Sequence, residues 1–480
     1  MICFWLLLAI AGLLGRSIFL FEPPNSDSSL FVFMGKMAAT TGVLGSDLLD
    51  TKFHSVGMLL SLPWRAFGGA WWMWGVLGMV MASAAAWCLA KAVDDRNAFW
   101  PTFAVAMLTL SNPSIVGGLF QLETILILGT SASAMFGLTA MRQKRFVPMF
   151  VAGLIAGTAA LAKPSALGVV VALALSACLV DTNWRTKLGM ISSLLAGLVA
   201  PAITFLAYPI ITNTWGDFLF ILEQIRLYSA GGSRDPSLYL RVVIIGGLLI
   251  APATVAWLHH RRWKASPAVV FAALWLSIEL AGVLGQARLY AYHFLVLAPP
   301  TVLMFGLAAR HIGFKQQLRA AAIAVVLLTS QTAATWINRQ PDAMGPAIRD
   351  VQGILSRTGG TVWSDDWSRM AIELDAPAPS RVPLLFLLTI HDDAPRVFGD
   401  RVLDDLRTTR PSVLVLPTVI QKHVRLMLNH NREFKDFARR GEGLASLWTQ
   451  IAATRDANYR LVSTHGRFGV YERVARFHID

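Results

Sequence analysis

Residues 188–212 read LGMISSLLAGLVAPAITFLAYPIIT and contain no charged side chain. A bilayer's hydrocarbon core, about 30 Å thick, is crossed by roughly 20 apolar residues in a helix, so this segment is long enough to span it. The whole chain has the same character, with 480 residues, 55% of them hydrophobic and 15% charged, and a mean hydropathy of +0.53. This composition excludes an ordinary water-soluble protein and predicts an integral membrane protein.

Further apolar segments of similar length occur along the first 338 residues, separated by short polar breaks. We expect about eleven transmembrane helices. The first, over 1–21, lacks the basic n-region and the cleavage site of a signal peptide, so we expect it to be retained. Three cysteines, Cys3, Cys88 and Cys178, lie in apolar segments and indicate neither a disulfide framework nor a metal site. The other spans are expected near 71–92, 98–114, 117–140, 146–162, 165–180, 188–212, 238–258, 266–285, 291–309 and 319–337.

The polar breaks between these segments alternate in charge. One set is basic, with RQKR at 142–145 and HHRRWK at 259–264 as examples, whereas the other set has fewer cations, dispersed among acids. Because Lys and Arg are enriched in cytoplasmic loops, the pattern predicts a cytoplasmic N-terminus. It also accounts for the net charge of +13 without nucleic-acid binding.

The composition changes after Trp336. The region contains three short β-rich runs, GGTVWSDDWSRMAIEL at 359–374, RPSVLVLPTVI at 410–420 and YRLVSTHGRFGVYERV at 459–474. Polar helical stretches such as 421–437 lie among them. An odd number of spans places this region on the side of the membrane opposite to the N-terminus. We therefore predict a polytopic α-helical membrane domain over 1–338, whose outer loop 22–70 holds amphipathic juxtamembrane helices, and a small extracytoplasmic α/β domain over 339–480.

Ionisable residues gather in the breaks predicted to face outward. Such groups are expensive at a membrane boundary, so their accumulation on the side without the basic anchors indicates a functional site. The opening outer stretch, NSDSSLFVFMGKMAATTGVLGSDLLDTKFHSVG at 25–57, carries Asp27, Asp47, Asp50, Lys52 and His54. On the same side we place Glu123, Lys163, Arg226, Arg234, Arg288, Tyr292 and His293.

Simpler roles are open for several of these residues. Asp27 suits the N-cap of an amphipathic helix lying on the outer surface, and Asp47 suits an ordinary turn. Lys163 in LAKPS suits an interfacial anchor as well as a site cation. Glu123 is harder to dismiss, because a carboxylate in an otherwise apolar run must be paired or solvated in a cavity. Glu279 in LWLSIELAG lies deeper, and either pairs with an outer cation or is a protonated packing residue.

Five stretches in a fixed order carry a family resemblance: SDSSLFVFMGKMAATTGVLGSDLLDTKF, LETILIL, LAKPSALGVV, RLYAYHFLVLAPP and FGVYERV. This order resembles the polyprenyl-phosphate-dependent GT-C glycosyltransferases, in particular the bacterial relatives of protein O-mannosyltransferases and aminoarabinose transferases. The resemblance covers most of the membrane part and implies a bacterial inner-membrane enzyme with a periplasmic C-terminal domain. The chain departs from the family pattern at Ser28, which replaces a second acid, and at Phe53 and His54, which replace two prolines.

The resemblance implies roles for the outer residues. Asp27 takes the place of the catalytic carboxylate, and Asp50 and Lys52 match a later acid and lysine of the same site. The acids expected in the cavity are Asp47, Asp50 and Glu123. The residues expected to bind the donor phosphate are Lys52, Lys163, Arg226, Arg234, Arg288, Tyr292 and His293.

These residue types suit a transfer of sugar from a polyprenyl-phosphate-linked donor. A carboxylate base takes the proton of an acceptor hydroxyl as that hydroxyl attacks the anomeric carbon, and direct displacement of phosphate inverts this centre. The expected partners are the donor, a glycan, lipid or protein acceptor, and membrane lipid. A divalent cation held by Asp50 with His293 or His54 is an open alternative, beside an ordinary interfacial role for His54.

Two other classes of protein are open. A lipid or sugar transporter or flippase would also be polytopic, but its ionisable residues should lie near the bilayer midplane, often with inverted repeats. No internal repeat is visible in the sequence. An accessory membrane protein would use the C-terminal domain and leave Asp27, Glu123 and Lys163 without a role.

Overall fold

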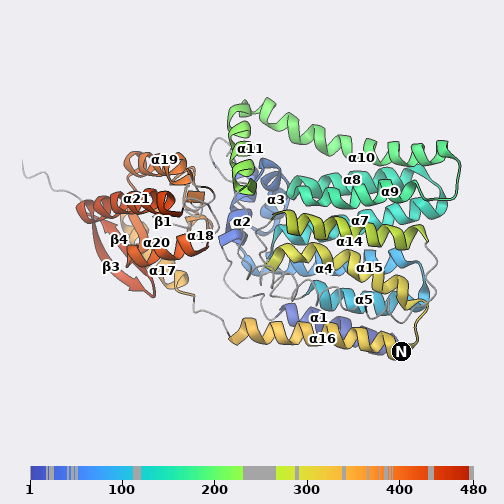
Figure 1. The fold of residues 1–480 in the computed structure, drawn as a ribbon. Helices are drawn as coiled ribbons and strands as arrows, with labels where there is room; N and C mark the ends of the chain where they lie inside the picture. The colour runs from blue at the N-terminus through green and yellow to red at the C-terminus, as the bar shows by residue number, and fades with distance from the viewer. Residues whose placement is uncertain are drawn as a thin grey trace, which may run out of the picture. The chain divides into compact units, whose positions relative to one another are not determined.

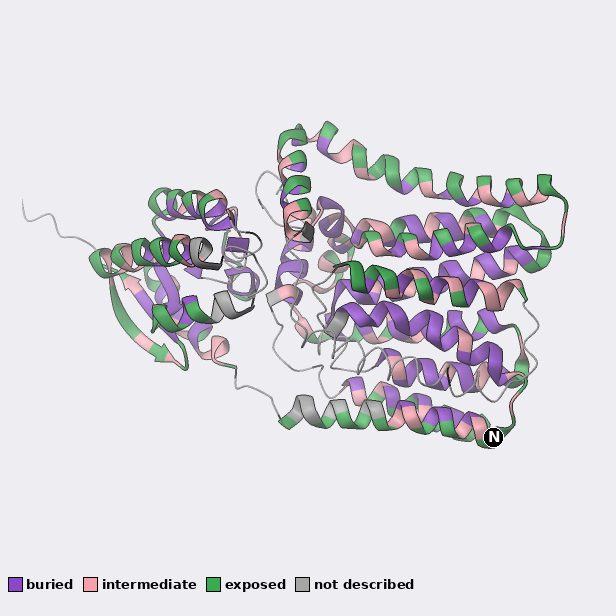
Figure 2. Ribbon diagram, in the orientation of Figure 1, coloured by how far each residue is buried: buried purple, intermediate pink, exposed green. Residues whose placement is uncertain are grey.

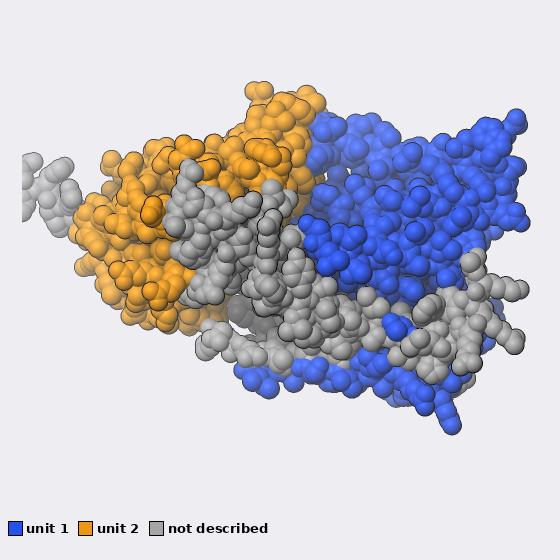
Figure 3. Space-filling model, in the orientation of Figure 1, with its two compact units in different colours: residues 1–22, 70–208, 235–339 blue, residues 23–69, 209–234, 340–480 orange. Residues whose placement is uncertain are grey.

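In the computed structural model of the chain, the described residues are 2–17, 20, 26–40, 43–44, 48, 52–111, 120–230, 254, 266–286, 291–337, 342–364, 367–377, 379–382, 387–388, 391, 393–430 and 437–474. The chain forms two compact units, coloured separately in Figure 3. Unit 1 contains residues 1–22, 70–208 and 235–339, and unit 2 contains residues 23–69, 209–234 and 340–480.

Unit 1 is a bundle of apolar helices that lie side by side (Figure 1). Short polar breaks, often with a left-handed residue such as Asp94 or Lys144, end one helix before the next begins. The helices are α1 (Ile2–Ser17), α4 (Trp71–Val93), α5 (Arg96–Leu110), α7 (Leu122–Gln143), α8 (Phe146–Ala162), α9 (Leu167–Ala177), α10 (Trp184–Ile211), α14 (Pro267–Gln286), α15 (Ala298–Ala309) and α16 (Phe314–Ile337), with the 3-10 helices η1 (Pro164–Ala166) and η3 (Ala291–Leu297).

Four described helices, α4, α7, α10 and α14, are long and apolar enough to cross a membrane. The other predicted spans coincide with α1, α5, α8, α9, α15 and α16, except the span at 238–258, of which only Thr254 belongs to the described residues. The chain is therefore mostly helical with membrane-spanning helices, and the count of eleven spans stays a prediction.

Small residues set the spacing of α8 and α10. A Cβ atom added to Gly153 would lie 2.0 Å from the carbonyl oxygen of Leu194, and one added to Gly197 would lie 2.1 Å from that of Phe150. Because lipid tails are as apolar as the side chains, helices in a membrane associate largely through such close approaches. The two glycines thus allow a backbone contact that any larger residue would prevent.

The outer surface of α10 is apolar and open. Val199 is 51% exposed and Ile203 is 61% exposed, and Figure 2 shows exposed residues along the whole helix. An apolar face of this length would be costly in water and is favourable against hydrocarbon. This surface agrees with an integral membrane protein.

The two ends of unit 1 differ in charge. Arg142 at the end of α7 donates a hydrogen bond to the carbonyl oxygen of Ala92 and pairs with Asp94 at 3.4 Å, so the ends of α4 and α7 lie together. We call this the Asp94 end; Lys91 and Arg96 lie there too, and a cleft of about 880 Å³ opens between α1, α4, α5 and α16. The opposite, Glu123 end contains the start of α7 and the end of α8.

Unit 2 contains a four-stranded mixed sheet in the order β1-β2-β4-β3. β1 pairs with β2 in parallel, with Val362 opposite Val413, and β4 is antiparallel to both β2 and β3. Gly466, with φ of 56°, provides the tight turn of the β3–β4 hairpin. The strands are β1 (Val362–Ser364), β2 (Val413–Pro417), β3 (Tyr459–His465) and β4 (Phe468–Arg473).

Helices cover this sheet and extend unit 2. Ile348 and Val351 of α17 pack against Val413 and Val470 of the sheet, which gives this part its own hydrophobic core. The predicted β-rich runs at 410–420 and 459–474 are confirmed as β2 and the β3–β4 hairpin. The run at 359–374 is a strand only at β1, and its second half is the helix α18, so the prediction was wrong there. The helices of unit 2 are α2 (Ser26–Ala39), α3 (His54–Phe67), α11 (Trp215–Ala230), α17 (Met344–Thr358), α18 (Trp367–Glu373), α19 (Ala394–Thr409), α20 (Ile420–His430) and α21 (Phe437–Asn458).

The helix predicted to lie on a surface, α2, is buried in its first half. Leu30, Val32 and Phe33 are buried, and so are Ser28 and Ser29. α2 packs against α3 and α18, so both of its sides are covered. The prediction of an amphipathic helix with one exposed face was therefore wrong for this half of α2. The second face is covered by α18, which lies more than 300 residues further along the chain and so could not be inferred from the local sequence pattern.

Candidate functional site

The Glu123 end of unit 1 holds a buried ion pair. Glu123 lies in the first turn of α7, and Lys163 lies between α8 and η1 in an extended conformation, as expected for a residue before a proline. Lys163 Nζ is 2.6 Å from Glu123 Oε1. The Glu123 side chain is 4% exposed and the Lys163 side chain is 21% exposed. Glu123 is therefore paired, and Lys163 points to a carboxylate instead of acting as a surface anchor.

A second carboxylate lies near this pair. Glu279 of α14 is buried and accepts a hydrogen bond of 3.0 Å from Trp275 Nε1. It lies over Gly168 at the start of α9, where an added Cβ would be 2.6 Å from Glu279 Oε1. Lys163 also interacts electrostatically with Glu279. One ammonium group is thus attracted to carboxylates from α7 and α14.

Aromatic and imidazole groups flank the same end of the bundle. His293 lies in η3 and is buried, and η3 packs against α7 and α14. Tyr292 precedes it in η3. Trp74 of α4 and Phe120 form an edge-to-face pair with 5.4 Å between ring centroids. The predicted residues His293, Glu123 and Lys163 therefore belong to elements that pack on one another.

Arg16 is a cation that sequence reasoning did not single out. It is 5% exposed, and its Nη1 donates to the carbonyl oxygen of Leu110 at 3.3 Å. Its guanidinium lies against Gly78 of α4. Within the described part of the chain, its Nη2 has no hydrogen-bond partner and the residue has no carboxylate partner. The signal was present in the sequence, because Arg16 is the charged residue in the apolar run 2–17.

Asp27 and Lys52 belong to unit 2. α2 begins at Ser26, so Asp27 lies inside the first turn and not at the predicted N-cap position. A carboxylate is favoured there by the helix dipole. Lys52 is half-buried before α3. His54 opens α3, is buried, and lies edge-on to Phe218 with 5.9 Å between ring centroids.

Arg226 is engaged by a neighbour on its own helix. Its Nε and Nη2 donate to the two carboxylate oxygens of Glu223 at 2.7 and 2.6 Å. This hydrogen bonding holds the pKa of Glu223 below its usual value. Both side chains are exposed. A donor phosphate at Arg226 would have to displace this carboxylate, which makes the residue a weaker phosphate ligand than the sequence suggested.

Several predicted site residues cannot be located. Four of the predicted site residues lie outside the described part of the chain: Asp47, Asp50, Arg234 and Arg288. In the described part of the chain, no three His, Cys, Asp or Glu side chains are grouped to hold a metal ion. The cation site expected from Asp50 and His293 therefore stays a prediction.

No protein-family model matches the chain, and no curated protein matches it. The fold is similar to a crystal structure of the Archaeoglobus fulgidus oligosaccharyltransferase in complex with Zn and sulfate, at 12% sequence identity and a TM-score of 0.46. This likeness covers 91% of this chain and 70% of that chain.

Proposed function

We propose that the chain is an integral membrane glycosyltransferase of the GT-C type that moves a sugar from a polyprenyl-phosphate donor to an acceptor hydroxyl on the outer face of the membrane. The observation that carries this proposal is the buried Glu123–Lys163 pair, with Glu279 beside it, at one end of an apolar bundle. Ionisable groups in such a place are expensive and mark functional sites. The ordered sequence resemblance supplies the reaction class.

The reaction would proceed by direct displacement. Asp27 takes the proton of the acceptor hydroxyl while the hydroxyl oxygen bonds to the anomeric carbon of the sugar. The bond between that carbon and the phosphate oxygen breaks, and the phosphate leaves with the electron pair, so the anomeric centre is inverted. No general acid is required, because a phosphate is a good leaving group.

Cations at the Glu123 end would receive the donor phosphate. Lys163 offers a single positive charge, which its partner Glu123 holds in place. Arg16 offers guanidinium N–H donors, and among the described residues it is paired with no carboxylate. A divalent cation at Asp50 and His293 would add further neutralisation of the donor phosphate. No step above depends on a metal ion.

Transfer from a labelled donor tests the reaction. The purified full chain in liposomes would be given undecaprenyl phosphates carrying radiolabelled mannose, glucose or aminoarabinose, with bacterial envelope fractions as acceptors. We expect label in the acceptor fraction and a loss of at least about 10²-fold with Asp27→Asn, the usual contribution of a general base. Asp181→Asn, which removes an exposed charge between α9 and α10, is the matched control. Full transfer by Asp27→Asn would eliminate Asp27 as the base.

Cross-linking tests whether the predicted residues share one site. Cys3, Cys88 and Cys178 would first be replaced by alanine. Asp27→Cys and Glu123→Cys would then be introduced together, and the chain treated with a thiol-reactive cross-linker spanning about 15 Å. This length is chosen because groups that serve one reaction must reach one substrate. We expect an intramolecular cross-link. Asp181→Cys with Glu123→Cys is the control pair expected to remain unlinked, since these positions lie at opposite ends of unit 1. An unlinked Asp27 pair would contradict the shared site.

A further inference from the structure

A cleft of about 810 Å³ in unit 2 is lined by none of the predicted site residues. Its walls come from the ends of α17, α19 and α21, from Ser412 just before β2, from the start of β3 and from the end of β4. All of these elements belong to residues 340–480, so the cleft is complete within the C-terminal part of the chain. Its charged lining residues are Arg407, Arg410, Arg473 and Glu472.

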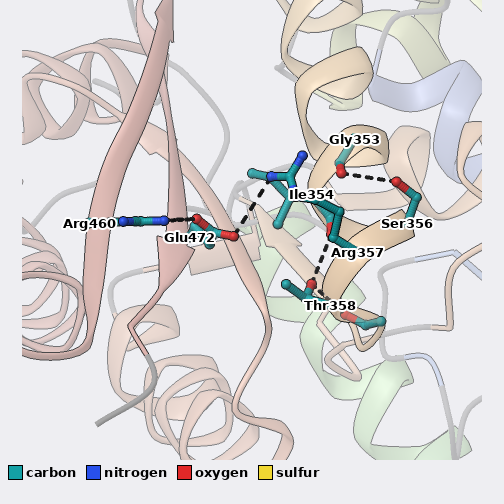
Figure 4. Close-up of polar contacts among 8 residues, drawn as sticks. Gly353, Ile354, Ser356, Arg357, Thr358, Arg460 and Glu472 are labelled. Carbon is teal, nitrogen blue, oxygen red and sulfur yellow. Dashed lines mark hydrogen bonds and ion pairs between the residues drawn. The ribbon is translucent and has the colours of Figure 1, made fainter. Parts of the chain in front are cut away.

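Among the described residues, one carboxylate lines the cleft, that of Glu472, and it is paired with arginines. Glu472 is 13% exposed, and Arg460 donates to its Oε2 from Nη2 at 2.8 Å. Arg357, from the last turn of α17, lies 4.0 Å from its Oε1. Figure 4 shows Glu472 between these two arginines. An incoming anion would therefore meet little repulsion from this carboxylate.

The three lining arginines have no such partner. Among the described residues, none of Arg407, Arg410 and Arg473 forms an ion pair with a carboxylate. Arg473 donates to the carbonyl oxygen of Arg410 at 3.2 Å, and Arg410 donates to that of Arg407 at 3.4 Å. A guanidinium has five N–H donors, so most of these groups remain available to a ligand.

Two features distinguish the cleft from a set of arginines that merely complement helix dipoles. Arg410 follows α19 with φ of 43°, in the left-handed region where glycine is the usual choice, and it lines the cleft. Tyr459 places a half-buried ring in the wall and donates its hydroxyl to the carbonyl oxygen of Pro411 at 2.8 Å. Ser412 and Asn458 add polar groups that suit sugar hydroxyls.

We infer that this cleft binds an anionic saccharide, a sugar chain that carries carboxylate or phosphate groups. The arginines would bind the anionic groups with charge-assisted hydrogen bonds, and the polar lining and the Tyr459 ring would contact the sugar. A lipid headgroup shares the anionic chemistry, but the concave, polar lining favours a saccharide. That this saccharide is the acceptor rests on the proposed function.

Direct binding tests the inference. Isothermal titration would use the purified full chain in neutral detergent, with trigalacturonic acid as the anionic probe, maltotriose as its neutral counterpart, and inorganic phosphate. Trigalacturonic acid is expected to bind at least about tenfold more tightly than maltotriose or inorganic phosphate. Its affinity should fall as the salt concentration is raised. Arg410→Gln with Arg473→Gln should weaken it on the order of tenfold per arginine. Arg349→Gln with Arg396→Gln, which removes two exposed arginines of α17 and α19, is the matched control.

Each contrary result has a definite meaning. Equal binding by the Arg410 and Arg473 double variant would overturn the site. Phosphate binding as tight as that of trigalacturonic acid would overturn the saccharide and leave an ion site. Binding of short-chain phosphatidylglycerol without trigalacturonic acid would reassign the cleft to lipid. Because Asp27→Asn should bind the probe normally, a failure here is distinguishable from a failure of the transfer reaction.

Discussion

Breaking the Glu123–Lys163 pair from its two sides should have unequal effects on stability. Lys163→Gln leaves a carboxylate that is 4% exposed and has no other cation partner among the described residues. Glu123→Gln leaves an ammonium that is 21% exposed and still within the field of Glu279. The lysine change should therefore cost more than the glutamate change.

The magnitudes follow from these surroundings. Removing one partner of a well-buried pair costs about 3–5 kcal/mol, and we expect Lys163→Gln to fall in this range. We expect about 1–2 kcal/mol for Glu123→Gln, because Lys163 keeps water contact and a second carboxylate. The double variant should lose less than the sum of the single variants, with a coupling of about 2 kcal/mol.

Unfolding of the purified chain measures these differences. Tryptophan fluorescence would follow unfolding as dodecyl sulfate replaces a mild detergent, and the three variants complete a double-mutant cycle. The exposed pair of Glu223 and Arg226 is the control cycle and should show a coupling below about 1 kcal/mol. Additive effects of Glu123→Gln and Lys163→Gln, or a larger loss for the glutamate change, would refute this reasoning.

Two further predictions concern packing and pH. Gly153→Ala should lower the thermal midpoint of unfolding, because the new Cβ would lie 2.0 Å from a carbonyl oxygen of α10. Gly282→Ala is the control and should leave the midpoint unchanged, because an added Cβ there has no atom within 4 Å. Equal effects of the two variants would contradict the close approach of α8 and α10. Burial lowers the pKa of His423 from 6.5 to about 4, so His423 is protonated at a higher pH in the unfolded chain than in the folded one. The free energy of unfolding should therefore fall by about 3 kcal/mol as the pH drops from 6.5 to 4. His423→Phe keeps an aromatic ring against Trp448 and should remove this part of the pH dependence. Denaturation measured between pH 7 and pH 4 gives the free energy of unfolding at each pH, and the same pH dependence in this variant would contradict the prediction.

Local patterns predicted the secondary structure well. Apolar runs such as 146–162 became helices at almost the expected residues, because a run of this length in a membrane must satisfy its own backbone hydrogen bonds. The β-rich runs at 410–420 and 459–474 became strands for the equally local reason of β-branched composition. The ends were less accurate, with α5 ending at Leu110 and α7 beginning at Leu122.

The pairing of charged groups was predictable only in kind. Glu123 had to find a partner because of its apolar surroundings, but several outer cations were available in the sequence. The antiparallel packing of α7 and α8 brings Lys163, forty positions away, to 2.6 Å. Arg226, an equally plausible candidate, has its own carboxylate one helical turn away.

The sequence by itself determined that this protein belongs in a membrane, where its helices lie and that its charged residues serve some purpose, since hydropathy and charge act on each segment locally. Only the tertiary structure decided which groups meet: that α2 is buried under residues beyond 340, that Arg16 lies within the bundle, and that three arginines from α19 and β4 surround one cleft. Such contacts join segments far apart in the chain, and their energies depend on distance and burial, which no local pattern contains.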